Sequence, residues 1–307
     1  MNGSSKPSVL VVGSVAYDNI ISPHGRGDWL LGGSASYGSI AASYFAPTRL
    51  VGVVGGDFRD EDRQRLSRHN IDLAGLQTNP QGKTFFWEGE YASDFSSRTT
   101  RDLQLNVFET FEPQLPEPYS HSDFVLVGNI QPSLQARVMD MVSNPTAFHL
   151  IDTIDFWIGQ DREAVATNFR RASAVVINDS EVALFTGESN PILGARKMLA
   201  DGTRTLILKK GEHGVLLFTG DTIFALPAYP VTDLRDPTGA GDSFAGALLG
   251  RLAELQDSSL PALKQALLYA TATASLTVEA FSTNRLESAG RPEIEARVAE
   301  LRRMVSL

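Results

Sequence analysis

The sequence predicts an α/β protein in which a mostly parallel sheet is covered by helices on both faces. Short runs rich in Val, Ile and Leu recur along the chain, and segments with helical periodicity separate most of them. Strands buried on both faces give such continuous apolar runs, and the helices between them serve as crossovers. We expect strands at 8–14, 48–55, 123–130, 147–154, 173–178 and 203–211.

The remaining segments support one catalytic unit that spans residues 1–307. Residues 214–231 are expected to form a hairpin at the edge of the sheet, with its turn at Gly220 and Asp221. No internal repeat, low-complexity tract or linker divides the chain. The expected helices cover 33–46, 59–70, 132–143, 161–171, 190–201, 238–255, 260–280 and 291–305.

Two stretches break this pattern and predict a small separate sheet. Residues 83–110 alternate aromatic or aliphatic side chains with polar ones, which is typical of a hairpin with one exposed face. Residues 16–31 contain Pro23, Gly25 and Gly27 between two short apolar runs. We expect both stretches to join in one antiparallel sheet that projects from the main domain as a lid.

Composition excludes several classes of function. The chain has no cysteine, so it offers neither disulfides nor thiolate ligands. The net charge of -9 argues against nucleic acid or an anionic membrane as a partner. No apolar run approaches the roughly 18 residues of a membrane span. The start, "MNGSSKPSVLVVGS", lacks the features of an export signal, which predicts a cytoplasmic protein.

The stretch "DPTGAGDSFAGALLG" (236–250) predicts a phosphate-binding helix start. A glycine inside a helix costs on the order of 1 kcal/mol relative to alanine. The first turn of a helix carries unpaired amides and a partial positive charge, and glycines let a bulky anion approach them. Gly239, Ala240 and Gly241 are therefore predicted to form an anion pocket.

Asp242 directly follows these glycines, where a carboxylate repels a phosphate unless it has a separate task. Taking a proton from an attacking hydroxyl is such a task. The alternative is that Asp242 only complements the helix dipole, but a simple cap does not need the surrounding glycines. Asp242 is therefore the candidate general base.

Two other phosphate-binding motifs do not fit. The "GKT" at 82–84 has Gln77 where a Walker A loop needs glycine, and a strand pattern follows it. The dinucleotide fingerprint requires glycine at the position of Phe244, and it belongs after the first strand of a fold.

The glycine motif resembles the C-terminal signature of the ribokinase/PfkB carbohydrate kinase family, D-[TP]-T-G-A-G-D-x-F. Four further landmarks agree in order: "VVGSVAYD" (11–18), the double glycine Gly32–Gly33, "NDSE" (178–181) and "KKGEHGV" (209–215). The resemblance covers nearly the whole chain. It implies a three-layer ribokinase-like fold with a β-lid.

The same resemblance implies transfer of the γ-phosphoryl group of ATP to an alcohol. Asp242 matches the family's catalytic base, and residues 239–241 match its anion hole. Asn178 and Glu181 match the N-x-x-E motif that organises Mg²⁺ and the phosphates, which suits the preference of Mg²⁺ for oxygen ligands. An alternative is that Asn178 caps the next helix and Glu181 completes a capping box.

Other residues match the family's substrate and nucleotide sites. Asp18 corresponds to the acid that accepts hydrogen bonds from acceptor hydroxyls, or else it is a turn aspartate. Gly32 and Gly33 lie where the backbone approaches the substrate, or they mark a loop-to-helix junction. On the nucleotide side the matched positions are Lys209, Lys210, Gly211, Thr238 and Thr271. The alternatives there are a solvated strand-end lysine and core packing of Thr271.

Three departures separate this chain from the family pattern. Tyr37 stands where relatives often have an acceptor-binding asparagine, which indicates a reshaped acceptor pocket. The D-x-N segment keeps Asp152 but not its asparagine. Asp236 and Thr238 match the start of a monovalent-cation loop, but Ser282 replaces a glycine that usually completes it, which argues against potassium activation.

These observations predict an ATP- and Mg²⁺-dependent kinase for a small sugar. A nucleoside is the first alternative, because the lid contains Phe85, Phe86, Trp87 and Tyr91, which can stack on a base. These aromatic residues are equally suited to packing a homodimer through the lid. A catalytically silent sugar- or nucleotide-binding regulator is the alternative from a different class, and the intact Asp242 argues against it.

Overall fold

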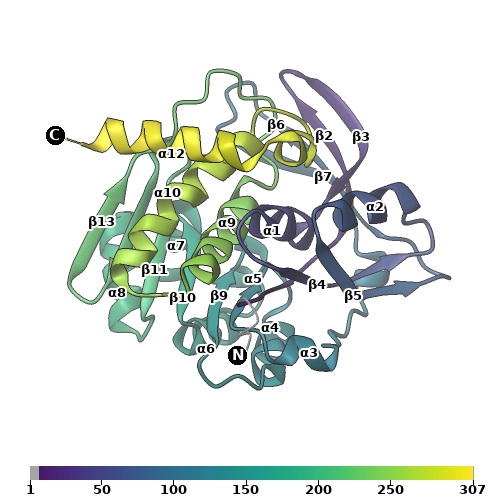
Figure 1. Cartoon of the computed structure of the whole chain (residues 1–307), viewed down its shortest axis with the longest axis horizontal. Helices are drawn as coiled ribbons and strands as arrows, with labels where there is room; N and C mark the ends of the chain where they lie inside the picture. The colour runs from purple at the N-terminus through teal and green to yellow at the C-terminus, as the bar shows by residue number, and fades with distance from the viewer. Residues whose placement is uncertain (1–6, 307) are drawn as a thin grey trace, which may run out of the picture.

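The computed structural model describes residues 7–306, and the polar leader at 1–6 lies outside them. A nine-stranded sheet runs through the molecule (Figure 1). All its neighbouring strands are parallel except at the β11–β12 and β12–β13 pairs. Across the sheet the strands are β13 (Thr222–Leu226), β12 (Val215–Thr219), β11 (Thr205–Lys209), β10 (Ala174–Asn178), β9 (Phe148–Asp152), β8 (Phe124–Val127), β1 (Val9–Val12), β4 (Thr48–Gly55) and β5 (Ile71–Asn79).

The predicted strands and the edge hairpin are confirmed, and one strand was not predicted. β5 lies at the sheet edge and mixes exposed and buried residues, so its sequence "IDLAGLQTN" lacks the continuous apolar run of a central strand. The hairpin of β12 and β13 turns at Gly220 and Asp221 as expected.

Helices cover both faces of the sheet, because successive side chains of its central strands point to opposite faces and are all buried. Val9 and Val11 of β1 point into one apolar cluster, and Leu10 and Val12 point into the other. The first cluster is closed by α1 (Ser34–Ser43), α2 (Asp60–Arg68), α9 (Ala240–Leu255), α10 (Leu260–Thr277), α11 (Asn284–Ser288) and α12 (Arg291–Val305). The second is closed by α3 (Glu117–Ser120), α4 (Pro132–Met141), α5 (Asp155–Gln160), α6 (Arg162–Arg171), α7 (Asp179–Thr186) and α8 (Pro191–Ala200).

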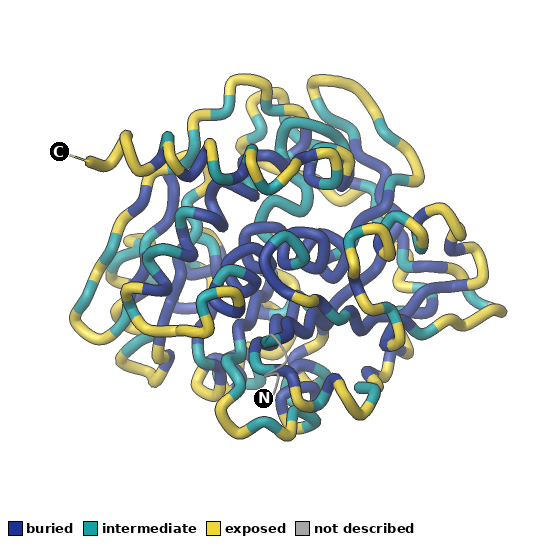
Figure 2. The backbone as a smooth tube through the Cα atoms, in the orientation of Figure 1, coloured by how far each residue is buried: buried dark blue, intermediate teal, exposed yellow. Residues whose placement is uncertain are grey.

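Figure 2 shows this core as a continuous buried band through the middle of the molecule, with exposed backbone at the periphery. All eight predicted helices are present, with shifts of a few residues at their ends. Within residues 7–306, no helix combines the length and the apolar character needed to cross a bilayer.

A separate four-stranded sheet forms the lid in the order β3 (Gly25–Gly32), β2 (Ala16–Ser22), β6 (Phe85–Tyr91) and β7 (Arg98–Gln104). It differs from the expected antiparallel sheet in one pair. β2–β3 and β6–β7 are antiparallel, but β2 and β6 run parallel, because both enter the lid from the main domain. β7 is exposed along its whole length, and pairing of the lid with a second subunit stays a prediction.

The strand order reverses between β8 and β1, which defines a topological switch point. In open α/β sheets, ligands bind outside the carboxyl ends of the strands at such a point. The loops after β1, β9, β10 and β11 all lie at this edge, and the lid follows directly from β1.

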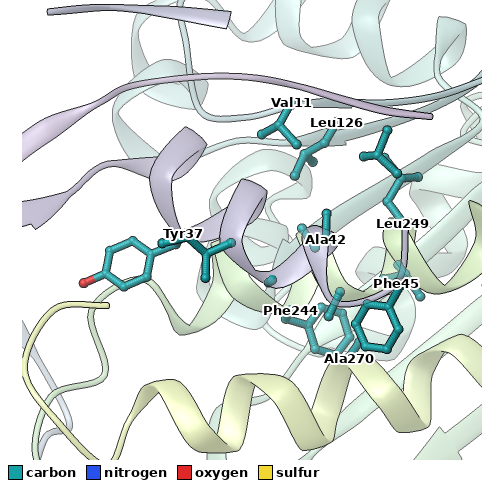
Figure 3. Packing of buried hydrophobic residues seen from close by; sticks show 14 of the residues in the cluster. Val11, Tyr37, Ala42, Phe45, Leu126, Phe244, Leu249 and Ala270 are labelled. Atoms are coloured by element: carbon teal, nitrogen blue, oxygen red, sulfur yellow. The ribbon is translucent and has the colours of Figure 1, made fainter. Parts of the chain in front are cut away.

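Close contact between α1 and α9 explains two of the glycines in the 236–250 motif. A Cβ on Gly246 would lie 2.1 Å from the carbonyl oxygen of Gly38, and one on Gly250 would lie 2.7 Å from that of Ala42. Figure 3 shows the apolar side chains that fill the space around this contact, including Phe244 and Phe45. Gly246 and Gly250 therefore serve helix packing, which leaves Gly239 and Gly241 for the helix start.

Candidate active site

Three neighbouring strands end in polar side chains at the carboxyl edge of the sheet. Asp152 ends β9, Asn178 ends β10 and Lys209 ends β11. The parallel register places Asn178 directly opposite Lys209. The Lys209 ammonium lies 3.4 Å from both carboxylate oxygens of Asp152. The side chain of Asp152 is only 7% exposed and that of Lys209 19%, so this ion pair is shielded from solvent.

The start of α9 lies against this ion pair. Gly239 is the N-cap, with a left-handed φ of 74°, and α9 begins at Ala240. A Cβ on Gly239 would lie 2.4 Å from the ring of Tyr37, and one on Gly241 would lie 3.0 Å from the Lys209 ammonium. The glycines thus leave no side chain between the backbone of residues 239–241 and the Lys209 ammonium. The free amides of this first turn favour an anion in that place.

Asp242 is half-buried behind this bare backbone. Burial, together with the nearby charge of Asp152, raises the pKa of Asp242 to about 7, although the charge of Lys209 acts in the opposite direction. A carboxyl group with this pKa is about half ionised at neutral pH, and its ionised form is basic enough to accept a proton from an alcohol in a transition state. The geometry therefore suits the predicted role of general base.

Asn178 and Glu181 form the capping box that the sequence left as an alternative. The Asn178 Oδ1 accepts a hydrogen bond from the Glu181 amide at 2.8 Å, and the Glu181 Oε2 accepts one from the Asn178 amide at 2.9 Å. Burial raises the pKa of Glu181 to about 7, and Lys209 opposes this shift. These two hydrogen bonds fix both side chains at the junction of β10 and α7, at the carboxyl edge of the sheet.

The donor set at this edge fits Mg²⁺ only together with phosphate groups. Among the described residues, no group of three or more His, Asp or Glu side chains converges as a complete metal site. Mg²⁺ keeps several waters and is commonly held by one or two carboxylates plus substrate phosphates. Glu181 and Asn178, placed opposite the bare backbone of α9, suit such a shared site.

The acceptor-side residues lie between the lid and α1. Asp18 is buried on β2, and a Cβ on Gly32 would lie 1.9 Å from its carboxylate. Gly33, with φ 91°, passes so close to the loop after β1 that a Cβ would lie 2.4 Å from the Ser14 carbonyl oxygen. The Gly32–Gly33 pair is therefore required by close backbone approaches on both sides. Burial, reinforced by Asp236 and Asp242, raises the pKa of Asp18 well above its usual range.

Tyr37 lies between these two groups of residues. Its ring packs under Gly239, and Figure 3 shows its hydroxyl pointing away from the apolar cluster. Burial raises the pKa of this phenol well above its usual range, and the charges of Asp236, Asp18 and Asp242 add to the effect. Tyr37 thus lies close enough to the carboxylates of Asp18, Asp236 and Asp242 for their charges to act on its hydroxyl.

Thr238 connects the main domain to the lid. Its hydroxyl lies 2.8 Å from that of Tyr91 on β6, and its amide donates to the Asp236 Oδ1 at 2.9 Å. The other Asp236 oxygen accepts from the Ser282 amide at 3.3 Å, and the Ser282 hydroxyl donates to the Leu31 carbonyl at 2.6 Å. Ser282 adopts a left-handed φ of 60°, the conformation that suits a glycine at this position.

The other residues predicted for the nucleotide side, Gly211, Lys210 and Thr271, make fewer contacts with the rest of the site. Gly211 has a left-handed φ of 54° and open space beside it, which leaves room for a ligand. Within residues 7–306, no hydrogen bond or ion pair joins the side chain of Lys210 to the cluster around Lys209. Thr271 is buried on α10, and its hydroxyl has no partner among the described residues.

The structure also places one residue at the site that sequence reasoning missed. Arg98 on β7 lies close enough for its charge to lower the pKa of both Asp18 and Asp242. Its position depends on the pairing of β6 with β7, which contains a register shift between Glu88 and Gly89. No local sequence pattern predicts that shift.

Comparison with known proteins agrees with this geometry. The model of the pfkB family carbohydrate kinases matches residues 30–289. A cytidine kinase from Thermococcus kodakarensis is 29% identical over 252 residues, which cover 78% of this chain and 87% of that protein. An aminoimidazole riboside kinase from Salmonella typhimurium is 34% identical over 288 residues, or 89% of each chain.

Among solved structures, a putative ribokinase II from E. coli in complex with ATP and Mg²⁺ has the same fold. Its TM-score is 0.78 at 19% identity, and the alignment covers 96% of this chain and 99% of that one. The family match spans the ends of β9, β10 and β11 and the glycine motif at the start of α9. The chain therefore belongs to the pfkB family of carbohydrate kinases.

Proposed function

We propose that this protein transfers the γ-phosphoryl group of ATP to a hydroxyl of a nucleoside, with Asp242 as the general base and residues 239–241 as the anion hole. One observation carries the proposal: a carboxylate with a pKa of about 7 lies in the first turn of α9, directly after Gly239 and Gly241. Phosphoryl transfer needs mainly positioning and charge neutralisation. The helix start provides both beside a proton acceptor.

The reaction balances with these groups alone. The acceptor oxygen forms a bond to the γ-phosphorus, the bond from that phosphorus to the bridging oxygen of ADP breaks, and Asp242 takes the hydroxyl proton. The amides of residues 239–241 stabilise the equatorial oxygens of the transferred group. Lys209, 3.0 Å from the Cβ position of Gly241, adds a positive charge at the same place.

Mg²⁺, when bound with ATP, would neutralise charge on the phosphates and orient them. Asn178 and Glu181 are the residues of this chain that would hold it, since the capping box keeps both fixed. Gly211 would line the nucleotide, because the space beside it is open.

A nucleoside is favoured over a free sugar by the inner face of the lid. Trp87 pairs in register with Asp18 across β2 and β6, so an aromatic residue lies on the same face of the lid as the carboxylate expected to bind the ribose hydroxyls. Two relatives that align with 78% and 89% of this chain are named as a cytidine kinase and an aminoimidazole riboside kinase. A small sugar, the acceptor predicted from the sequence, is the second candidate, since a fructokinase from Klebsiella pneumoniae is 26% identical over 281 residues, or 82% of this chain.

A screen for transfer tests this proposal. Purified protein with MgATP is offered cytidine, adenosine, inosine, D-ribose and D-fructose, and both ADP release and the mass of the product are measured. We expect a monophosphate of one nucleoside, and a 100- to 10,000-fold lower kcat for Asp242→Asn, the usual range for a positioned base.

The outcomes separate the alternatives. Phosphorylation of a sugar but of no nucleoside would select the second candidate. Tight binding of ATP and an acceptor without any product would identify a silent regulator. Full turnover by Asp242→Asn would remove Asp242 from its proposed role.

A further inference from the structure

The inner face of the lid presents a row of side chains toward the main domain. Side chains alternate along a strand, so Trp87, Gly89 and Tyr91 of β6 share one face, and Asp18 of β2 lies beside Trp87 on it. The Tyr91 hydroxyl lies 2.8 Å from that of Thr238, which directly precedes Gly239. This face of the lid is therefore directed at the anion hole.

Arg98 is held on the same face. It pairs with Tyr91 across β6 and β7, and its guanidinium carbon lies 5.1 Å from the centre of the Trp87 ring. A Cβ on Gly89 would lie 2.0 Å from the Trp87 ring, so the indole lies over this glycine. Stacking on the indole orients the guanidinium without neutralising it.

Arg98 differs from the neighbouring lid arginines in its charge pairing. Arg26 lies 2.7 Å from Asp28, and Arg101 forms an ion pair with Glu90. Among residues 7–306, no carboxylate lies within ion-pair distance of Arg98. Its side chain instead lines a cavity of about 500 Å³ between β7 and α5. Its charge is therefore available to a ligand.

The site needs this charge. Asp18, Asp152, Glu181 and Asp242 interact electrostatically with one another or with Lys209, and Lys209 is itself paired with Asp152. The positive charge of Arg98 lowers the pKa of Asp18 and of Asp242. A triphosphate adds further negative charge, so a second protein cation, besides Lys209 and the Mg²⁺ that accompanies ATP, would favour transfer of the terminal phosphoryl group.

We propose that Arg98 is a catalytic residue of the lid that contacts the oxygens of the phosphoryl group during its transfer. The inference rests on the proposed function and adds a residue to it. A guanidinium offers several donors in a fixed plane and suits phosphate oxygens. Arg98 could alternatively bind a phosphate that the acceptor already carries, but the Asp18 carboxylate on the acceptor side would repel such a phosphate. The anion that Arg98 binds is therefore the phosphoryl group that is transferred. Closure of the lid thereby completes the charge balance of the site.

The test compares Arg98→Ala and Arg98→Lys with Arg101→Ala, an exposed arginine three residues along the same strand. Turnover is measured with MgATP and the best acceptor among cytidine, adenosine, inosine, D-ribose and D-fructose. We expect kcat to fall about 10²- to 10³-fold in Arg98→Ala, as for other lost transition-state donors. Arg98→Lys should keep an intermediate rate, and Arg101→Ala should match the wild type.

Chemical rescue by free guanidinium distinguishes a catalytic role of Arg98 from a structural one, because free guanidinium would not restore a structural contact. Guanidinium chloride at low millimolar concentration should raise the kcat of Arg98→Ala and leave that of Arg101→Ala unchanged. Equal kcat values for the two alanine variants would overturn the inference, and so would a rise in the acceptor KM alone. If the wild-type protein phosphorylates none of the acceptors, the proposed function fails first and the inference fails with it.

Discussion

At the scale of single residues, the site is a set of buried charges whose pKa values depend on one another. Burial raises the pKa of Asp242 and of Glu181 to about 7, and the Lys209 ammonium limits both shifts. Lys209 is itself fixed by Asp152 at 3.4 Å. One cation thus favours the ionised forms of both carboxylates, Asp242 as the proposed proton acceptor and Glu181 as the proposed Mg²⁺ residue.

The raised pKa of Asp242 predicts a pH-dependent effect on stability. A carboxyl whose pKa is higher in the folded than in the unfolded state favours folding less as pH rises from about 4 to about 7. Asp242→Asn should therefore melt roughly 2–4 °C above the wild type at pH 8, because one pKa unit is about 1.4 kcal/mol and partial exposure reduces the effect.

Thermal melts at pH 5 and pH 8 provide this measurement. The advantage of Asp242→Asn should shrink at pH 5, where the wild-type carboxyl is protonated in the folded state. An exposed control, Asp221→Asn at the β12–β13 turn, should show no such trend. A variant that is less stable than the wild type at pH 8 would contradict the raised pKa.

At the scale of secondary-structure elements, the glycines of α9 divide into two groups with different tasks. Gly239 takes a left-handed φ under the Tyr37 ring, and Gly241 faces Lys209, so both shape the helix start. Gly246 and Gly250 allow α9 to lie against the backbone of α1. The second pair holds the first in place, because α1 also carries Tyr37 and follows Gly33.

This division predicts opposite effects for two Gly→Ala substitutions in helices. Gly246→Ala places a methyl group 2.1 Å from the Gly38 carbonyl oxygen, so the helices must separate, at a cost of about 1–3 kcal/mol. Gly159→Ala in α5 meets no atom within 4 Å and should stabilise the protein by up to about 1 kcal/mol. Denaturant unfolding of both variants measures the difference. Equal stability of the two variants would refute the packing role of Gly246.

At the scale of the whole molecule, the sequence predicted the main sheet and its helices because their apolar periodicity is local. It also singled out Asp242, the glycines of the anion pocket at 239–241 and the Asn178–Glu181 pair as candidate site residues, since each group occupies a few consecutive positions. The Asp152–Lys209 ion pair depends on the register of three strands, and the place of Arg98 depends on a shift between β6 and β7. Such contacts between distant segments have no signature in a single sequence.

The lid and the main domain contact each other next to the start of α9. Tyr91 contacts Thr238, and Ser282 links the Asp236 loop to the last residues of β3. These contacts tie the lid to the backbone that immediately precedes Gly239. Closure over an acceptor would exclude water from the phosphoryl group at the same time.

A crystal structure with Mg²⁺ and a non-hydrolysable ATP analogue tests the central claim most directly. We expect the terminal phosphorus against the amides of residues 239–241, with the Asp242 carboxylate on the side from which an acceptor hydroxyl approaches. A terminal phosphate bound elsewhere, away from the start of α9, would contradict the proposed mechanism.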